Sequence, residues 1–407
     1  TGLIFYAYFH HWVYWVVVVG LLFIHALIFK RQDREYLKNY LILFASLAVV
    51  VIPYFVNYFQ FNSLPAAQDF IYREGVAYGR SLGILSVNLA DYAVYLALAI
   101  IAYFLYWKSD RRKALLFFGM IAAMAIVWNV QLVVGYSPVP HFFRRAISPI
   151  IFIILFDFLR EMARRWEIVR PHAKKIFLVV LLVLSVFVIA KKLVNIVSIA
   201  NKIQPHLIDY YNFPSDLVSS WGWINSHLDP EPKIISPSTM TSLYLMTYTA
   251  ARPFLPTAFA TLLPMRDIED RYLTAHKLFG VSEKKLRQRL EGKMPTDCDG
   301  YQCYADKNSN LNDSFWHIYG NYFASRYATF KTFIAGGATQ VAQKRAEKVD
   351  ELADRYRPLV VSWKNVDADY VYVSPWEKDL GIANLSWDPS LKLIYQNSLV
   401  EIYQIQR

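Results

Sequence analysis

The chain has 407 residues, of which 55% are hydrophobic and 16% aromatic, and its formal net charge is +11 at pH 7. Several runs exceed the roughly 18 apolar residues that suggest a bilayer-spanning helix, which argues against a soluble protein. Residues 1–200 hold 20 Lys and Arg against 9 Asp and Glu, whereas residues 201–407 hold 23 of each. The charge excess therefore lies in the apolar half, where membrane topology accounts for it without any nucleic acid partner.

Six apolar runs in the first half predict six membrane-spanning helices. The loops after the first, third and fifth runs are rich in Lys and Arg, so the positive-inside rule places these three loops in the cytoplasm. The N-terminus, the 62–85 loop, the 137–145 turn and everything after about residue 200 are then expected outside the cell. The predicted spans lie at about residues 3–29, 40–61, 86–107, 114–136, 146–160 and 176–200.

The second half reads as a soluble mixed α/β domain. Short apolar runs bounded by turn residues predict strands, and charge spacing predicts several helices, the first of them with Ser215 as a possible cap. We therefore expect a membrane α-helical bundle over residues 1–200 and an extracytoplasmic mixed α/β domain over residues 201–407. The predicted strands are residues 233–236, 252–256, 369–374 and a terminal hairpin of 391–396 and 399–405. The predicted helices are 213–227, 240–250 and 265–292, with more helix in 313–357 that is broken near Gly336–Gly337.

The stretch SPVPHFFRRAISP carries two adjacent arginines, Arg144 and Arg145, in a turn predicted to lie outside. Two guanidinium groups can hold a phosphate through charge-assisted bidentate hydrogen bonds, and lipid phosphates lie at this depth. With His141 beside them, these arginines are candidate phosphate-binding residues. Ordinary anchoring in the lipid headgroups is an equally good interpretation of the same pattern.

Three carboxylates are weak candidates for a catalytic role. Asp91 lies inside the third predicted span, where a carboxylate costs about 2.5–3.5 kcal/mol and should face a cavity or a partner, although a structural hydrogen bond is the alternative. Asp69 and Glu74 lie in the 62–85 loop among aromatic residues and could present a general base at the membrane surface. A solvated amphipathic helix is the favoured interpretation of that loop. Asp157, with Arg160 and Glu161 beside it, is expected to belong to a snorkelling ion pair near the cytoplasmic end of its span, with Arg160 as the cation.

Cys298 and Cys303 are the two cysteines, and in an extracytoplasmic domain the motif DCDGYQC favours a disulfide over two free thiols. Zinc would need two further ligands, and none is obvious. The sequence has no P-loop, no dinucleotide-binding glycine motif, no nucleophile elbow and no HExxH zinc motif. A cofactor is therefore undefined: a divalent metal is one option, but no metal-site motif supports it.

The order of these parts resembles the C-terminal part of the C-type (GT-C superfamily) integral membrane glycosyltransferases. The resemblance is carried by aromatic-rich spans, by Arg144 and Arg145 just before a span, by WINSHLDPEPKIISPSTMTSLYLMTYTAARPFL, and by a terminal hairpin ending in VEIYQIQR. It implies transfer of a sugar from a polyprenyl-phosphate donor to an acceptor at the outer face, with Arg144 and Arg145 on the donor phosphate. Family members usually carry the catalytic carboxylate in a first outer loop. This chain starts at Thr1 rather than Met and lacks a long acidic loop there; if residues upstream of Thr1 are missing, the catalytic carboxylate is expected to be missing with them.

The alternative is a non-catalytic membrane subunit whose outer domain docks a protein partner. The electrically balanced second half is rich in Tyr and Trp, which are favoured at interfaces. Both hypotheses place the protein in the plasma (inner) membrane with the C-terminal domain outside, in contact with membrane lipid and without nucleic acid.

Overall fold

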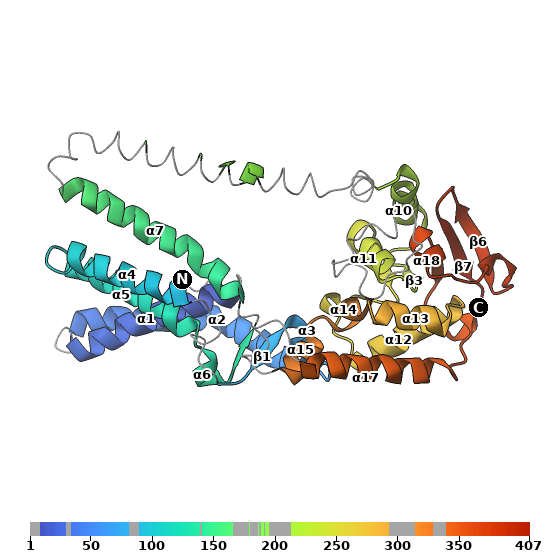
Figure 1. Ribbon diagram of the computed structural model, residues 1–407, viewed down its shortest axis with the longest axis horizontal. Helices are drawn as coiled ribbons and strands as arrows, with labels where there is room; N and C mark the ends of the chain where they lie inside the picture. The colour runs from blue at the N-terminus through green and yellow to red at the C-terminus, as the bar shows by residue number, and fades with distance from the viewer. Residues whose placement is uncertain are drawn as a thin grey trace. The chain divides into compact units, whose positions relative to one another are not determined.

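The computed structural model describes residues 9–29, 34–80, 89–138, 141–165, 213–292, 314–328 and 339–407, with short pieces between 179 and 194 (Figure 1). The chain divides into two compact units. The first comprises Thr1–Leu64, Val76–Val194 and Ala324–Ala338, and the second comprises Pro65–Gly75, Asn195–Phe323 and Thr339–Arg407. The short segment after the second apolar helix thus belongs with the C-terminal half of the sequence.

The first unit is helical, with one small two-stranded sheet. Pro53 lies inside α2 and Pro149 inside α7. Its helices are α1 (Phe9–Phe29), α2 (Arg34–Asn62), α4 (Leu89–Tyr106), α5 (Arg111–Val127), α6 (Gln131–Val134) and α7 (His141–Arg165), and its strands are β1 (Val76–Tyr78) and β2 (Tyr136–Pro138).

Two of these helices are long and apolar enough to cross a membrane. They are Trp12–Phe29 within α1 and Leu37–Asn62 within α2. Only 6% of the α2 window is buried, whereas the core helix of a soluble protein is mostly buried. Both helices therefore weakly support membrane insertion.

The prediction of six membrane-spanning helices is not supported. The apolar part of α4, Tyr92–Tyr106, is too short for a complete span, and the 17-residue α5 begins with three cations. α7 has 25 residues, but charged side chains occur at both of its ends and at Asp157. Most of the sixth run lies outside the described residues.

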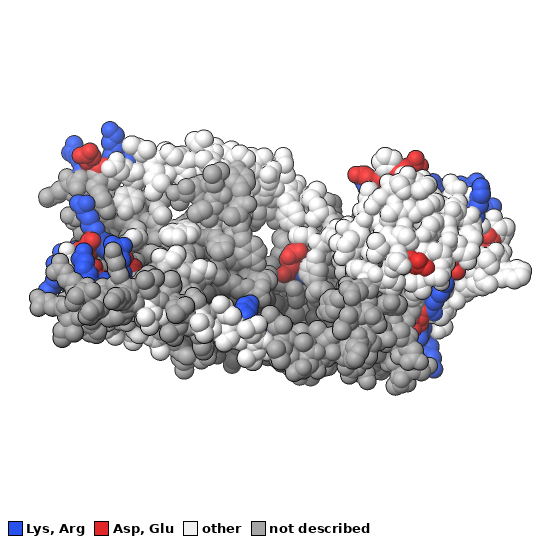
Figure 2. Space-filling model, turned by 90° about the horizontal axis from the view of Figure 1, so that it is seen from above, with Lys and Arg blue, Asp and Glu red and all other residues white. Residues whose placement is uncertain are grey.

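The core of the first unit is made by α1, α4, α5 and α7. Tyr14 of α1 donates a buried hydrogen bond to the carbonyl of Met120 in α5 (3.0 Å). Gly119 of α5 has no side chain, and the Leu22 side chain of α1 packs directly against it. In Figure 2 the coloured charged side chains of this unit gather mainly at one end, and the described surface away from that end is mostly white, as expected for helices that face lipid.

The second unit is built on a five-stranded mixed sheet in the order β4-β3-β5-β7-β6. β3 pairs in parallel with β4 and β5, while β7 pairs antiparallel with β5 and β6. All four residues of β5 are buried, as expected for the central strand, and the terminal hairpin is confirmed. The strands are β3 (Lys233–Ile235), β4 (Arg252–Pro253), β5 (Tyr370–Val373), β6 (Leu391–Gln396) and β7 (Glu401–Ile405).

Helices pack around this sheet. The prediction that Ser215 caps the first of them is wrong. Ser215 is the first residue of α10, not its cap, because Pro214 takes the N-cap position and no side chain caps that end. The predicted helix over 265–292 is two helices separated by Gly280 in the left-handed region. The helices are α3 (Ala67–Glu74), α10 (Ser215–His227), α11 (Thr239–Tyr248), α12 (Met265–Leu278), α13 (Glu283–Leu290), α14 (Ser314–Tyr319), α15 (Tyr322–Tyr327, which crosses the boundary between the units), α17 (Thr339–Tyr356) and α18 (Pro375–Asp379), with 3₁₀ turns η4 (Ala258–Ala260), η7 (Trp363–Asn365) and η8 (Leu385–Trp387).

Candidate functional site

A two-stranded ribbon joins the two segments that the sequence places outside the membrane. β1 pairs antiparallel with β2, with Val76 opposite Pro138, Ala77 opposite Ser137 and Tyr78 opposite Tyr136. Paired strands must lie on the same side of a bilayer, so this ribbon agrees with a common side for the 62–85 and 137–145 segments. The pairing was not foreseen, because three-residue strands leave almost no alternation to detect in a sequence.

Arg80 fastens the ribbon to the chain before β2. Its Nη1 donates to the carbonyl oxygens of Leu132 and Val133, both at 2.8 Å. Gly135 then turns the chain into β2 at φ 85°, a left-handed conformation that favours glycine. Its carbonyl accepts a hydrogen bond from Gly79 (2.9 Å), which continues the pairing beyond β1.

Hydrogen bonds fix one end of α4 against the end of α5. The side chain of Asn129 donates to the hydroxyl of Tyr92 (2.9 Å), and Trp128 Nε1 donates to the hydroxyl of Tyr95 (2.9 Å). Tyr92 and Tyr95 lie in the first two turns of α4, and Trp128 follows the last residue of α5. The start of α4 and the end of α5 therefore lie together, next to the chain that leads into the ribbon.

At the other end, Asp157 joins three helices. Its Oδ2 accepts from the hydroxyl of Tyr106 in α4 (2.6 Å) and lies 2.6 Å from Nζ of Lys113 in α5. Lys113 also lies over the ring of Tyr106, 4.6 Å from its centroid. The expected ion pair of Asp157 with Arg160 is therefore replaced by contacts to other helices, while Glu161 pairs with Arg164 (2.9 Å).

α4 and α7 run in the same direction, because both start near the ribbon and the end of α4 contacts Asp157 in the later part of α7. The positions of the candidate residues along the two helix axes, which we call their depth, can therefore be compared. Asp91 precedes Tyr106 by 15 residues, and Arg144 and Arg145 precede Asp157 by 13 and 12 residues. At about 1.5 Å per residue, these intervals are about 22 Å and about 18–20 Å. Asp91 and the two arginines therefore lie at nearly the same depth, within about one helical turn.

The segment that carries the arginines is not a turn. β2 covers Tyr136–Pro138 and α7 begins at His141, so Arg144 and Arg145 lie in the first turns of a 25-residue helix. The backbone N–H groups at such an end have no helical partner and favour an anion. The side chains of His141, Arg144, Arg145 and Asp91 lie outside the described part of the structure.

Asp69 and Glu74 lie on α3, within the second unit. Asp69 Oδ2 accepts a hydrogen bond from the backbone N–H of Met265 (2.8 Å), the first residue of α12. Because Pro264 at the N-cap offers no side-chain oxygen, Asp69 caps α12 from a distant part of the chain. Asp69 therefore has a structural contact. Glu74 is half-buried, and burial raises the pKa of its carboxyl against the attraction of Arg73.

Arg73, which the sequence did not single out, is fully buried. Its Nη2 donates to the carbonyls of Thr261 (3.0 Å) and Leu263 (3.1 Å), and its own carbonyl accepts from the N–H of Asn321 (3.0 Å). Nε and Nη1 have no hydrogen-bond partner, and burial lowers the pKa of the guanidinium. α3 is thus held to the second unit by backbone acceptors, which no sequence pattern reveals.

The remaining chemical candidates are the two cysteines and a divalent metal. Cys298 and Cys303 lie outside the described residues, so their disulfide stays a prediction. Within the described part of the chain, no group of three or more His, Cys, Asp or Glu side chains could hold a metal ion. The divalent-metal option therefore gains no support from these residues.

The fold and these contacts define a helical protein with two candidate membrane helices and a second unit built on a small mixed sheet. In comparisons with known proteins, no family model, curated protein or solved structure matches this chain.

Proposed function

We propose that the protein is a membrane glycosyltransferase, or the C-terminal part of one, that uses a polyprenyl-phosphate-linked sugar at the outer membrane face. The donor phosphate would lie at the N-terminal end of α7, against Arg144 and Arg145. The observation that carries the proposal is the common depth of Asp91 and these arginines at one end of the parallel helices α4 and α7. A carboxylate and two cations within one turn of depth suit a phosphate-bearing substrate.

The proposed reaction needs few groups. The acceptor hydroxyl oxygen forms a bond to C1 of the sugar while the bond from C1 to the phosphate oxygen breaks. Asp91 takes the hydroxyl proton, and the polyprenyl phosphate leaves with the electron pair of the broken bond. The guanidinium groups and the helix N-terminus stabilise the charge that grows on the leaving phosphate.

Binding of undecaprenyl phosphate to the full chain in nanodiscs tests this proposal. We expect Arg144→Ala to remove a charge-assisted contact of about 1.5–3 kcal/mol, which is about ten- to a hundredfold in binding. Arg144→Lys should also weaken binding, because the bidentate fork is lost while the charge stays. Arg164→Ala is the matched control, because Arg164 lies at the opposite end of α7 with 70% of its side chain exposed.

The outcomes separate donor binding from headgroup anchoring. An anchor tolerates Lys and loses little with Ala, so unchanged affinity in both Arg144 variants would overturn the donor-site proposal. For the carboxylate, Asp91→Asn should abolish turnover of a sugar-bearing lipid while leaving its binding intact. Full turnover in that variant would remove Asp91 from the proposed reaction.

The second candidate function, a membrane subunit that docks a partner, is favoured by one surface of the second unit. β6 is an edge strand of the sheet, and Trp387 just before it is 83% exposed. Exposed edge strands and aromatic side chains are common docking features. Trp387→Ser should then shrink the native complex extracted in mild detergent, whereas Val360→Ser, at a residue that is 92% exposed, should not. Equal complex size in both variants counts against docking at β6.

A further inference from the structure

The last turns of α2 carry two aromatic stripes. Tyr54 and Tyr58 are four residues apart, and so are Phe55 and Phe59. Residues at this spacing lie on one face of a helix, so the tyrosines and the phenylalanines form neighbouring rows. Phe55 and Phe59 are 46% and 67% exposed, as expected for a lipid-facing row.

The tyrosine row meets the ribbon. Tyr78 and Tyr136 are directly opposite each other in the β1–β2 pairing, and their ring centroids are 6.1 Å apart. Directly opposed residues of an antiparallel pair point to the same face. Burial, followed by the phenols of Tyr58 and Tyr78, raises the pKa of the Tyr136 phenol, so Tyr58 at the end of α2 lies within electrostatic range of this ribbon pair.

We call Tyr58, Tyr78 and Tyr136 the tyrosine platform. Its three residues are 45%, 36% and 39% exposed, so each presents part of its surface to the outside. Among the described residues of this surface, 53–64, 76–80 and 131–138, the charged side chain is Arg80, and no carboxylate occurs. Nη1 of Arg80 is engaged by two backbone carbonyls.

We propose that the tyrosine platform is the subsite for an uncharged pyranose ring of the donor. Axial C–H groups of a pyranose carry partial positive charge and suit the negative face of an aromatic ring, while phenol hydroxyls both donate to and accept from sugar hydroxyls. A cationic amino sugar finds no carboxylate among the described residues here. This proposal rests on the proposed function, which puts the donor phosphate at the start of α7.

Chain geometry makes the two subsites compatible. Tyr136 lies in β2, and α7 starts five residues later at His141. Five residues span at most about 18 Å, so the platform and the start of α7 are within reach of one lipid-linked sugar. The competing interpretation is an interfacial tyrosine belt, which would anchor the chain without recognising a sugar.

The test uses the full chain in nanodiscs with two lipids, undecaprenyl phosphate and undecaprenyl phosphate carrying a neutral hexose. We expect Tyr136→Ala to weaken binding of the hexose lipid about tenfold and to leave the bare phosphate lipid unchanged. Tyr136→Phe, which keeps the ring, should lose less. Tyr58→Ala lies on a helix surface and should show the same selectivity even where the Tyr136 variants disturb the ribbon. Phe59→Ala, on the neighbouring row, is the matched control and should change neither affinity.

Each result bears on one proposal. Equal loss for both lipids in Tyr136→Ala and Tyr58→Ala, or the same loss in Phe59→Ala, indicates an interfacial belt and overturns the sugar subsite. Failure of the proposed function looks different, because the unchanged chain then binds neither lipid and Arg144→Ala has no effect. In that case saturation-transfer NMR with neutral methyl pyranosides decides the subsite: transfer that disappears in Tyr58→Ala supports it, and no transfer to the unchanged chain overturns it.

Discussion

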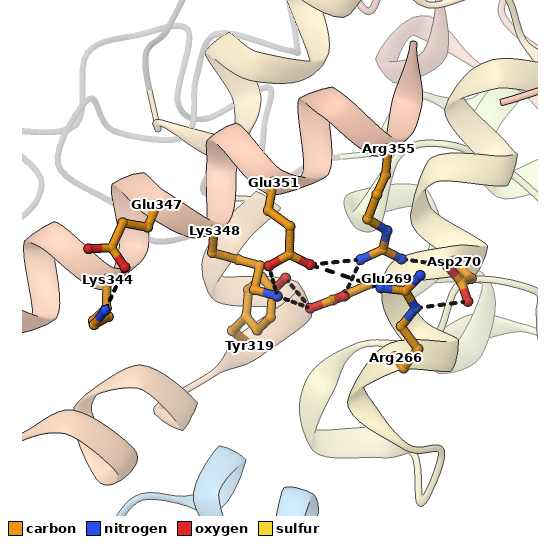
Figure 3. A network of polar contacts seen from close by, with 9 residues as sticks. All are labelled: Arg266, Glu269, Asp270, Tyr319, Lys344, Glu347, Lys348, Glu351 and Arg355. Carbon is orange, nitrogen blue, oxygen red and sulfur yellow. Dashed lines mark hydrogen bonds and ion pairs between the residues drawn. The ribbon is translucent and has the colours of Figure 1, made fainter. Parts of the chain in front are cut away.

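Replacing Glu269 by Gln should loosen the packing of α12 against α17 in the second unit. Glu269 is buried in α12 and accepts from the hydroxyl of Tyr319 (2.7 Å) and from Nη1 of Arg355 (2.5 Å), with Nζ of Lys348 at 3.4 Å (Figure 3). Burial, followed by the Glu269 charge, raises the pKa of Tyr319 well above its ordinary value, so Tyr319 stays protonated and donates. The Glu269 carboxylate is therefore contacted by donor groups from two other helices, α14 and α17.

The magnitude follows from what each partner retains. Gln has nearly the volume of Glu, so no cavity forms and the loss is electrostatic. Breaking a buried ion pair costs about 3–5 kcal/mol when the other charge is left alone. Arg355 keeps Asp270 and Glu351, and Lys348 keeps Glu351 (2.6 Å), so neither cation is stranded. We therefore expect the free energy of opening to fall by about 2–3 kcal/mol, the scale of a hydrogen bond to a charged group.

Hydrogen exchange of the full chain in detergent, followed by mass spectrometry over a urea series, measures this opening free energy in residues 265–278. The matched control is Glu347→Gln, because Glu347 pairs with Lys344 on the exposed surface of α17 and should show no change. Tyr319→Phe should lose about 1.5 kcal/mol, and the double variant should lose less than both losses added together. A change in Glu269→Gln no larger than in the control refutes the reasoning.

The strands of the second unit could be read from the sequence because each is a short apolar run between turn residues. Ile234 and Ile235 in β3 and the buried run of β5 show this directly. The prediction of six membrane-spanning helices was not supported, because the length of an apolar run in a sequence does not determine where the helix begins and ends. α5 keeps 17 residues since three cations begin it, and α7 takes in charges that the prediction had assigned to loops.

The residues of the candidate site were proposed from the sequence, whereas their relative positions could not be. Charge and hydropathy pointed to Arg144, Arg145 and Asp91, yet their common depth depends on the contacts of Asp157 with Tyr106 and Lys113. The capping role of Asp69 could not be foreseen, because its partner lies 196 positions away. Such long-range contacts leave no local periodicity, and local periodicity is what sequence reasoning detects.

Three further predictions test groups that the fold holds in place. Burial lowers the pKa of His276 to about 4, below about 6.5 in an unfolded chain, so stability present above pH 6.5 should fall by about 3 kcal/mol as the pH drops to 4. Urea unfolding at several pH values checks this, and the fall in stability between pH 6.5 and 4 should be smaller by about 3 kcal/mol in His276→Gln. Asp157→Asn leaves Lys113 without its carboxylate and should cost about 1.5–3 kcal/mol in detergent unfolding, with an unchanged midpoint counting against the three-helix contact. Asp69→Ala removes the acceptor that caps Met265 and should cost about 1 kcal/mol, whereas Asp69→Asn keeps an acceptor oxygen and should cost less. Because Asn cannot act as a base, Asp69→Asn also separates the two roles: sugar transfer that is retained with near-normal stability supports the cap, whereas transfer abolished at normal stability makes Asp69 a catalytic residue after all.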